Sequence, residues 1–143
     1  MPQKSREKKA RTKTIRQKAI IPAPPGEVFE VFMGAKQHAA FTGSAASLSR
    51  KVGGKFTAWD GYISGKNVKL VPGKRIVQEW MTTEWTEDDL PSTLDISLAT
   101  TKGGTELVMV HSGVPARLAA SLAHGWKEYY WRPLKEYFKS AKH

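Results

Sequence analysis

Hydrophobic residues follow two different spacings along this chain, and each spacing is typical of one kind of secondary structure. Between residues 48 and 111 they tend to alternate with polar residues, as expected for strands with one buried face. Between Arg117 and Lys139 they recur every three or four residues, which predicts an amphipathic helix. The chain is therefore expected to fold as an α+β domain in which a curved antiparallel sheet wraps the last helix.

Short segments rich in glycine, proline and asparagine divide the alternating region into strands. Such segments are typical of tight turns, and links of this length join neighbouring antiparallel strands. The predicted turns are 53–54, 65–67, 72–73 and 102–104. With one more strand near the N-terminus, the predicted strands are 14–21, 47–52, 55–63, 68–70, 75–83, 93–100 and 106–111.

Two short helices are expected between the first and second strands. Prolines end the first strand, and Pro25 suits the first turn of a helix because it has no backbone N–H to leave unpaired. Gly34 is expected to end this helix, and residues 38–42 to add one more helical turn. In the long final helix, Pro133 lacks a donor and is expected to bend the helix or divide it into two packed pieces.

The composition excludes several classes of protein. The chain has 143 residues, enough for one domain, and no apolar run approaches the ~20 residues of a membrane span. It has no cysteine, which excludes disulfides, thiolate catalysis and cysteine–zinc sites. Its N-terminus is charged rather than apolar, unlike a secretory signal. We therefore expect a cytoplasmic protein of one domain.

The net charge of +10 is concentrated at the N-terminus. Residues 1–18 carry eight basic residues and only Glu7, a net charge of +7, whereas the rest of the chain carries +3. The basic residues at 4–18 could contact nucleic acid or another polyanion weakly, but residues 1–14 offer no aromatic ring to stack on bases. The expected organisation is a disordered basic tail over 1–13, a domain over 14–139 and a C-terminal tail over 140–143.

Four segments together resemble one known family. In chain order they are GGKFTAWDGYISG (53–65), LVPGKRIVQEW (70–80), GTELVMVHSGVP (104–115) and GWKEYYWRPLKEYF (125–138). They are similar to the C-terminal domain of the activator of heat-shock protein 90 ATPase, within the START-related, Bet v-like helix-grip (SRPBCC) superfamily. The resemblance implies seven antiparallel strands gripping the long C-terminal helix, a cavity between sheet and helix, and a chaperone-associated role in the stress response.

Neither a phosphate-binding loop nor a metal site is predicted. A P-loop ending at Gly65-Lys66 would place Asp60 where its first glycine belongs, and the flanking residues have the pattern of strands. The histidines, at positions 38, 111, 124 and 143, have no ligand spacing, and the carboxylates between 84 and 89 are typical of a solvated loop. No metal and no cofactor is therefore expected.

Asp60 and His111 are the polar pair that could take part in acid–base chemistry. His111 is in phase with Leu107 and Met109, so its side chain is expected to point toward the long helix. It could act as the general base of a cyclase- or hydrolase-like enzyme, or it could hydrogen-bond a neighbouring strand or a tyrosine of the helix. The second alternative is favoured, and Asp60-Gly61 is expected to form a bulge or turn.

Aromatic and aliphatic residues of the strands and the long helix are expected to meet between sheet and helix. They could be plain core, or they could line a pocket in which a few polar groups orient a ligand. The favoured hypothesis is a non-enzymatic domain that binds a small hydrophobic or amphipathic molecule. The alternative is a co-chaperone-like protein that contacts an ATP-dependent chaperone, with Trp59 and Trp85 near the edges of the domain. The predicted cavity residues are Phe56, Gln78, Trp80, Ile96, Leu98, Met109, His111, Trp126, Tyr129 and Tyr130.

Overall fold

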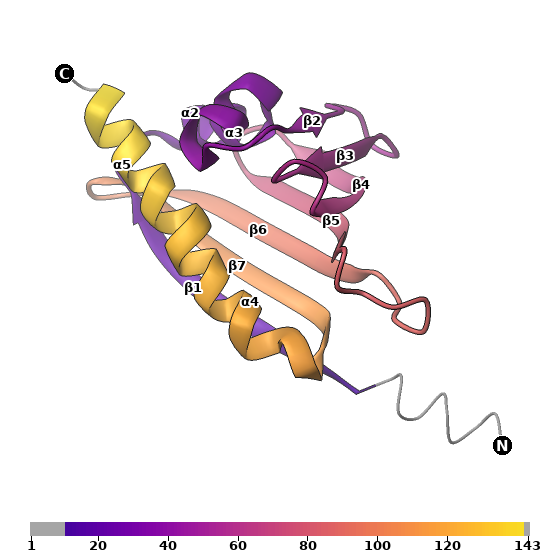
Figure 1. The fold of residues 1–143 in the computed structure, drawn as a ribbon. Helices are drawn as coiled ribbons and strands as arrows, with labels where there is room; N and C mark the ends of the chain where they lie inside the picture. The colour runs from indigo at the N-terminus through magenta and orange to yellow at the C-terminus, as the bar shows by residue number, and fades with distance from the viewer. Residues whose placement is uncertain (1–10, 142–143) are drawn as a thin grey trace, which may run out of the picture.

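A curved antiparallel sheet wraps a long C-terminal helix in the computed structural model, which describes residues 11–141 (Figure 1). Most of the predicted N-terminal tail, residues 1–10, and residues 142–143 lie outside this part of the chain. The strands are β1 (Thr12–Ile21), β2 (Ser47–Leu48), β3 (Lys55–Ala58), β4 (Ile63–Val71), β5 (Arg75–Thr82), β6 (Ser92–Thr101) and β7 (Gly104–Pro115). The helices are α2 (Pro25–Met33), α3 (Ala35–Thr42), η1 (Ala116–Leu118), α4 (Ala119–Trp126), η2 (Lys127–Trp131) and α5 (Arg132–Ala141).

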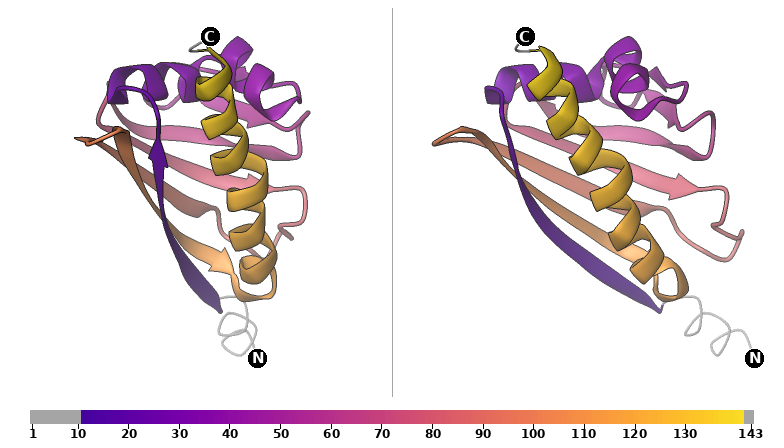
Figure 2. Two further views of the ribbon diagram at one scale, coloured as in Figure 1. Left: turned by 90° about the vertical axis from the view of Figure 1, so that its left-hand side faces the viewer. Right: turned by 60° about the vertical axis from the view of Figure 1, so that its left-hand side comes forward.

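The order of strands in the sheet is β1-β7-β6-β5-β4-β3-β2. From β2 to β7 each strand pairs with the next one along the chain, as expected from the short turns between them. β1 pairs instead with β7, because α2 and α3 carry the chain from one edge of the sheet to the other. The long helix lies across the concave face, and α2 and α3 cover one end of it (Figure 2). The predicted α+β helix-grip fold is confirmed.

Both short helices end where the sequence indicated, but α3 begins three residues earlier than expected, at Ala35. Pro25 is in the first turn of α2, and the N–H of Gly34 closes that helix on the carbonyl of Glu30. α3 is longer than the single turn expected, and it ends at Gly43, whose φ of 79° is in the left-handed region that favours glycine.

The structure corrects the prediction for residues 55–71. The strand expected over 55–63 stops at Ala58, because residues 59–62 form a tight turn in which Trp59 and Asp60 both have positive φ. The turn expected at 65–67 and the separate strand at 68–70 are wrong, since both segments lie inside β4. Asp60-Gly61, expected to form a bulge or turn, lies in this turn. A β-bulge occurs further along, where the register of β4 against β5 shifts between Asn67 and Lys69.

Asn67 explains why a turn-like residue occurs inside a strand. Its side-chain Nδ2 donates to the carbonyls of Ser49 and Lys51, at 2.7 and 3.0 Å. These bonds hold the segment after β2 out of the regular strand pairing. The strand β2 consequently has only two residues in the sheet instead of the predicted six. Asn67 is therefore a strand residue whose side chain holds the loop after β2 by hydrogen bonds.

Gly65 is required by the close approach of β4 to β5. It lies between Phe56 on β3 and Trp80 on β5 in the register of the sheet. A Cβ atom at this position would lie 1.8 Å from the carbonyl oxygen of Glu79 and 3.0 Å from the Phe56 ring. Glycine therefore allows two large aromatic residues on the concave face to flank the same position.

We predict that Gly65→Ala lowers the free energy of unfolding by about 3 kcal/mol or more, since backbone must move to admit the methyl group. Gly26→Ala is the matched control: nothing lies within 4 Å of the added Cβ, and in the first turn of α2 alanine should stabilise by about 0.5 kcal/mol. Urea denaturation of both variants checks this prediction, and equal stabilities would contradict it.

Candidate ligand cavity

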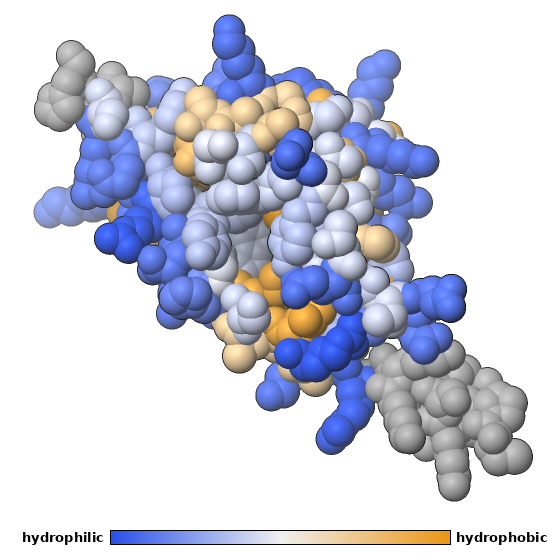
Figure 3. Space-filling view, viewed as in Figure 1, coloured by the Kyte–Doolittle hydropathy of each residue, from blue (hydrophilic) through white to orange (hydrophobic). Residues whose placement is uncertain are grey.

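A cavity of about 350 Å³ lies between the long helix and the strands opposite it. Figure 3 shows a hollow on this face of the molecule, with hydrophobic atoms exposed near its lower end. The helix supplies one wall, and the β3–β4 turn with β5 supplies the other. The lining residues are Trp59, Tyr62, Ile63, Trp80, Ser121, Leu122, Gly125, Trp126, Tyr129 and Tyr130.

Four of the ten predicted cavity residues line this space, namely Trp80, Trp126, Tyr129 and Tyr130. Tyr129 is at its rim, with 56% of its surface exposed. The other six are buried in the structure but do not line the cavity: Phe56, Ile96, Leu98 and Met109 belong to the packed core, and Gln78 and His111 to hydrogen-bond networks.

Trp59 was expected at an edge, yet it forms part of the cavity wall. The β3–β4 turn carries it across the opening, where its ring centroid lies 5.8 Å from that of Tyr129 and 6.2 Å from that of Tyr130. Its φ of 52° and that of Asp60, 57°, are unusual for residues other than glycine. The turn holds this strained shape through hydrogen bonds from the Asp60 N–H to the Ala45 carbonyl and from the Gly61 N–H to the Ala58 carbonyl.

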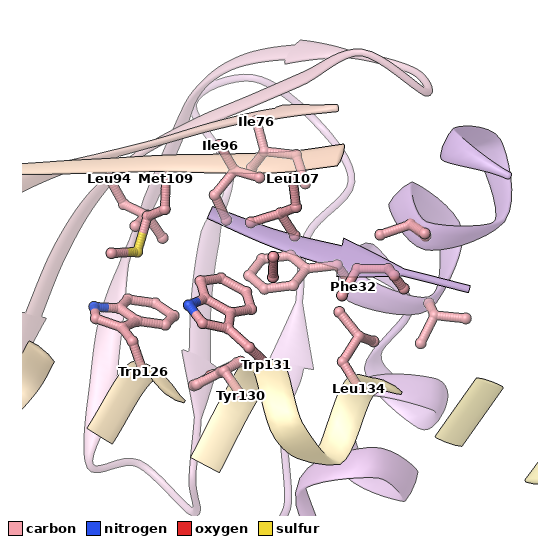
Figure 4. Close-up of a cluster of buried hydrophobic side chains, with 14 of the residues drawn as sticks. Phe32, Ile76, Leu94, Ile96, Leu107, Met109, Trp126, Tyr130, Trp131 and Leu134 are labelled. Atoms are coloured by element: carbon pink, nitrogen blue, oxygen red, sulfur yellow. The ribbon is translucent and has the colours of Figure 1, made fainter. Parts of the chain in front are cut away.

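The helical wall contains a π-helical turn, η2, between α4 and α5. Figure 4 shows Trp126 and Trp131 side by side between the helix and the sheet. In a regular α-helix, residue 131 would point about 140° away from residue 126. The wider turn, in which the Arg132 N–H bonds the Lys127 carbonyl, brings Trp131 onto the same face, where its ring stacks on Trp126 at 5.2 Å. The extra residue also shifts the buried face by one position, so Leu134 and Phe138 are buried whereas Tyr137 is only partly buried.

Pro133 accounts for this irregular turn. It has no N–H to donate to the carbonyl four residues earlier, so a regular α-helical bond is lost at this point. The helix neither breaks nor divides at Pro133; it accommodates the proline with the π-helical turn, and α5 continues from Arg132. The helix is therefore irregular near Pro133, as predicted, but the irregularity is a π-helical turn instead of a division into two pieces.

Gln17 on β1 connects the two ends of the π-helical turn. At one end the Lys127 N–H bonds the carbonyl of His124, and the Ala123 carbonyl accepts a hydrogen bond from Gln17 Nε2 at 2.8 Å. At the other end the indole N–H of Trp131 donates to Gln17 Oε1, also at 2.8 Å. One side chain therefore bonds both a carbonyl of the helix and an indole donor.

His38 on α3 fixes the phenol of Tyr130. The Phe32 carbonyl can only accept, so His38 Nδ1 donates to it at 2.9 Å, and Nε2 accepts from the Tyr130 hydroxyl at 2.9 Å. Burial lowers the pKa of His38 and raises the pKa of Tyr130, so both groups stay neutral. Tyr130 consequently offers a ring to the cavity while its hydroxyl is already bonded.

His111 is fully buried and both of its ring nitrogens are bonded. Trp126 can only donate, so its indole N–H donates to His111 Nδ1 at 3.0 Å, and Nε2 carries the proton and donates to Ser92 Oγ at 2.8 Å. Ser92 in turn donates to the Trp80 carbonyl at 2.5 Å. Burial lowers the pKa of His111 to about 3. The structure thus shows the favoured alternative, a histidine bonded to a neighbouring strand, and leaves no lone pair for a substrate.

Gln78 and Asp60 are also placed away from any catalytic arrangement. Gln78 Nε2 donates to Asn67 Oδ1 at 3.0 Å, within the network that supports the loop after β2. Asp60 is exposed on the β3–β4 turn. Asp60 and His111 therefore do not form a pair, and neither faces an open reaction site.

Three charged side chains, Glu84, Asp89 and Arg117, lie beside the rim of the cavity. The hydroxyl of Tyr62, a lining residue, donates to the carboxylate of Glu84 on the loop between β5 and β6. Arg117 ties the same loop to the helix, with its guanidinium 2.6 Å from Asp89 Oδ2 and bonded to the Glu84 carbonyl. The hydrogen bond from Arg117 lowers the pKa of Asp89 to about 2.

Two absences within residues 11–141 bear on function. No group of three or more histidine, aspartate or glutamate side chains in this range is arranged to hold a metal ion. No helix in this range is long and apolar enough to span a membrane.

The sheet, the gripped helix and the cavity between them define a helix-grip domain of the START-related, Bet v-like class. The family model described as Activator of Hsp90 ATPase homolog 1-like protein matches residues 22–139. The chain belongs to this family. The resemblance of the four sequence segments is thereby confirmed.

A curated relative and two solved structures illustrate the relationship. The human Activator of 90 kDa heat shock protein ATPase homolog 1 is 36% identical over 114 residues, covering 80% of this chain and 33% of the relative. The chain therefore spans about a third of the length of that relative. An HSP90 activator from Plasmodium falciparum has a TM-score of 0.78 at 24% identity, covering 90% of this chain and 96% of the other. The Aha1 dimer from Colwellia psychrerythraea has a TM-score of 0.71 at 17% identity, covering 82% and 90%. At these identities the two structures support the fold alone.

The buried histidines predict how stability depends on pH. In the unfolded chain a histidine titrates near pH 6.5, whereas burial lowers the pKa of His111 to about 3 and that of His38 in the same direction. Between these values the unfolded chain binds more protons, so stability is lost as the pH falls below about 6.5. Each histidine contributes up to about 1.4 kcal/mol per pH unit.

Urea denaturation between pH 8 and pH 5 measures this dependence. His111→Gln keeps an acceptor and a donor but cannot titrate, so its stability should fall less steeply with decreasing pH than that of the wild type. Identical pH slopes for the two proteins would contradict the neutral, buried state of His111.

Proposed function

We propose that this domain is a non-enzymatic binding module that holds a small hydrophobic or amphipathic molecule in the cavity between helix and sheet. The observation that carries the proposal is the cavity itself, about 350 Å³ with six aromatic residues in its wall. Cavities of this size and character are typical of ligand sites. The long helix does not fill the concave face of the sheet here, and the space opens to solvent beside the exposed ring of Tyr129.

The polar groups around the cavity support binding rather than catalysis. Within residues 11–141 every buried side-chain nitrogen or oxygen has a hydrogen-bond partner. The hydroxyl of Tyr130 is held by His38, and both nitrogens of His111 are bonded. A general base needs a lone pair within reach of the substrate proton, and this arrangement offers none from His111. The cyclase- or hydrolase-like alternative therefore has no structural support.

Gly125 allows the cavity to be filled without disturbing the core. It lies in α4 and lines the cavity, and a Cβ atom added there would meet only the Tyr129 ring, at 3.8 Å. Leucine is a good helix former, so Gly125→Leu should fold while its side chain occupies the binding space. Gly125→Ala is the matched control, expected to gain about 0.5–1 kcal/mol of stability and to leave most of the space open.

Binding is measured with the neutral fluorescent probe N-phenyl-1-naphthylamine, and native mass spectrometry of the purified protein tests for a retained molecule. We expect saturable probe binding to the wild type and Gly125→Ala, and an affinity about tenfold or more weaker for Gly125→Leu. The proposal fails if the wild type neither retains a molecule nor binds the probe, or if the leucine variant binds equally well.

Contact with a chaperone of the 90 kDa heat-shock class is a second candidate function. It is favoured by the 36% identity to a human protein named as an activator of that chaperone's ATPase. The domain would act through its surface, so this function is compatible with an occupied cavity. Weak polyanion contact through residues 4–18 and a cytoplasmic location remain predictions from the sequence.

This candidate is tested by the steady-state ATPase rate of a purified 90 kDa heat-shock protein. We expect the rate to rise with added domain and the two proteins to co-elute in gel filtration. The human activator serves as the positive control. An unchanged rate at high domain concentration, with the control active, would count against the chaperone contact.

A further inference from the structure

We infer that the cavity selects an organic cation, such as a quaternary or methylated ammonium group joined to an apolar body; this inference rests on the proposed binding function. It goes beyond the size and apolar character of the cavity, because it specifies the charge of the ligand. Its structural basis has three parts: the aromatic wall, the lack of charge in that wall, and the carboxylate at the rim.

The aromatic wall is the first part. Three tryptophans and three tyrosines line the space. The face of an aromatic ring carries partial negative charge and attracts cations, most strongly for tryptophan. Trp59 meets Tyr129 and Tyr130 at interplanar angles of 74° and 64°, so these rings are not stacked face to face. Trp126 packs against Trp131, Trp80 and Tyr130 and is only 3% exposed. The rings open to a ligand are therefore those nearer the rim, such as Tyr62 and Tyr129, which are 36% and 56% exposed.

The charge distribution is the second part. Among the described residues, none of the ten that line the cavity is charged. An anionic ligand would therefore lose its hydration without gaining a basic partner, which is unfavourable. Outside residues 1–18 the chain carries a net charge of +3, yet neither lysine nor arginine is present in this wall.

Glu84 is the third part. Its carboxylate accepts a hydrogen bond from Tyr62, which places a negative group directly against a lining residue. Arg117 is close to Glu84, but its guanidinium pairs with Asp89. These three charges at the rim therefore sum to a net negative charge, which is complementary to a cation bound below.

Three benzyl compounds of similar shape separate charge from hydrophobicity. Benzyltrimethylammonium is a cation, neopentylbenzene is its neutral carbon isostere, and phenylmethanesulfonate is an anion. Their affinities for the full chain are measured from the quenching of tryptophan fluorescence. We expect the cation to bind at least about fivefold more tightly than the neutral isostere, and the anion to bind most weakly.

Two variants test the groups that are invoked. Glu84→Gln should weaken binding of the cation several-fold without changing that of the neutral isostere, whereas Glu87→Gln, an exposed position in the same loop, should have a smaller effect. Tyr129→Leu keeps apolar area at the rim but removes a ring, so it too should weaken the cation selectively. Both Glu84 and Tyr129 are exposed, so neither change threatens the fold.

The outcomes distinguish this inference from the proposed function. If the neutral isostere binds as tightly as the cation or more tightly, the cation preference is overturned while the binding function stands. If Glu84→Gln affects the cation and the isostere equally, the assigned role of the carboxylate is overturned. If none of the three compounds binds the wild type, the inference fails, and the binding function fails with it only if N-phenyl-1-naphthylamine does not bind and no molecule is retained.

Discussion

The π-helical turn over residues 127–131 is the constraint on which the rest of this structure depends. It allows Trp126, Tyr130 and Trp131 to face the interior together, and each of the three then donates a hydrogen bond to a different element. Trp126 reaches His111 on β7, Tyr130 reaches His38 on α3, and Trp131 reaches Gln17 on β1. A buried donor left without its partner costs about 1–3 kcal/mol, so these bonds fix the position of the helix over the sheet.

The cavity follows from the same constraint. With the helix held at these points, Gly125 and Leu122 face the β3–β4 turn, and Tyr129 is displaced to the rim. Trp59 reaches toward the helix from a turn with two residues in the left-handed region. Strain of this kind persists only where surrounding contacts compensate for it, here the rings of Tyr129 and Tyr130 and the Asp60–Ala45 hydrogen bond. The wall is therefore positioned by contacts on both sides of the space.

Much of the fold could be predicted from periodicity, because one face of each strand and of the helix is buried. The limits of the prediction lie in particular residues. Asn67 looks like a turn residue, but in the fold its amide supports a loop distant in sequence. Pro133 indicated an irregular helix without indicating that the irregularity is a π-helical turn, after which Phe138 is buried and Tyr137 only partly so.

The candidate site was harder to predict for a related reason. Four of its ten lining residues come from the β3–β4 turn or are small residues of α4, and alternation does not single them out: Trp59, Tyr62, Ser121 and Gly125. Gln17 and His38 carried no signal beyond being polar residues near apolar ones, since their partners are about a hundred residues away. The WDGY sequence was the feature that could have indicated the position of Trp59. Asp-Gly between two strands is typical of a hairpin turn, and a tryptophan in such a turn can reach beyond the edge of the sheet.

A crystal structure of the protein as purified tests the central claim most directly. The account predicts electron density for an ordered molecule bounded by Trp59, Trp126 and Tyr129, with Tyr130 still bonded to His38. It would be contradicted by side chains of Trp59 and Tyr129 collapsed into the space, leaving no room for a ligand.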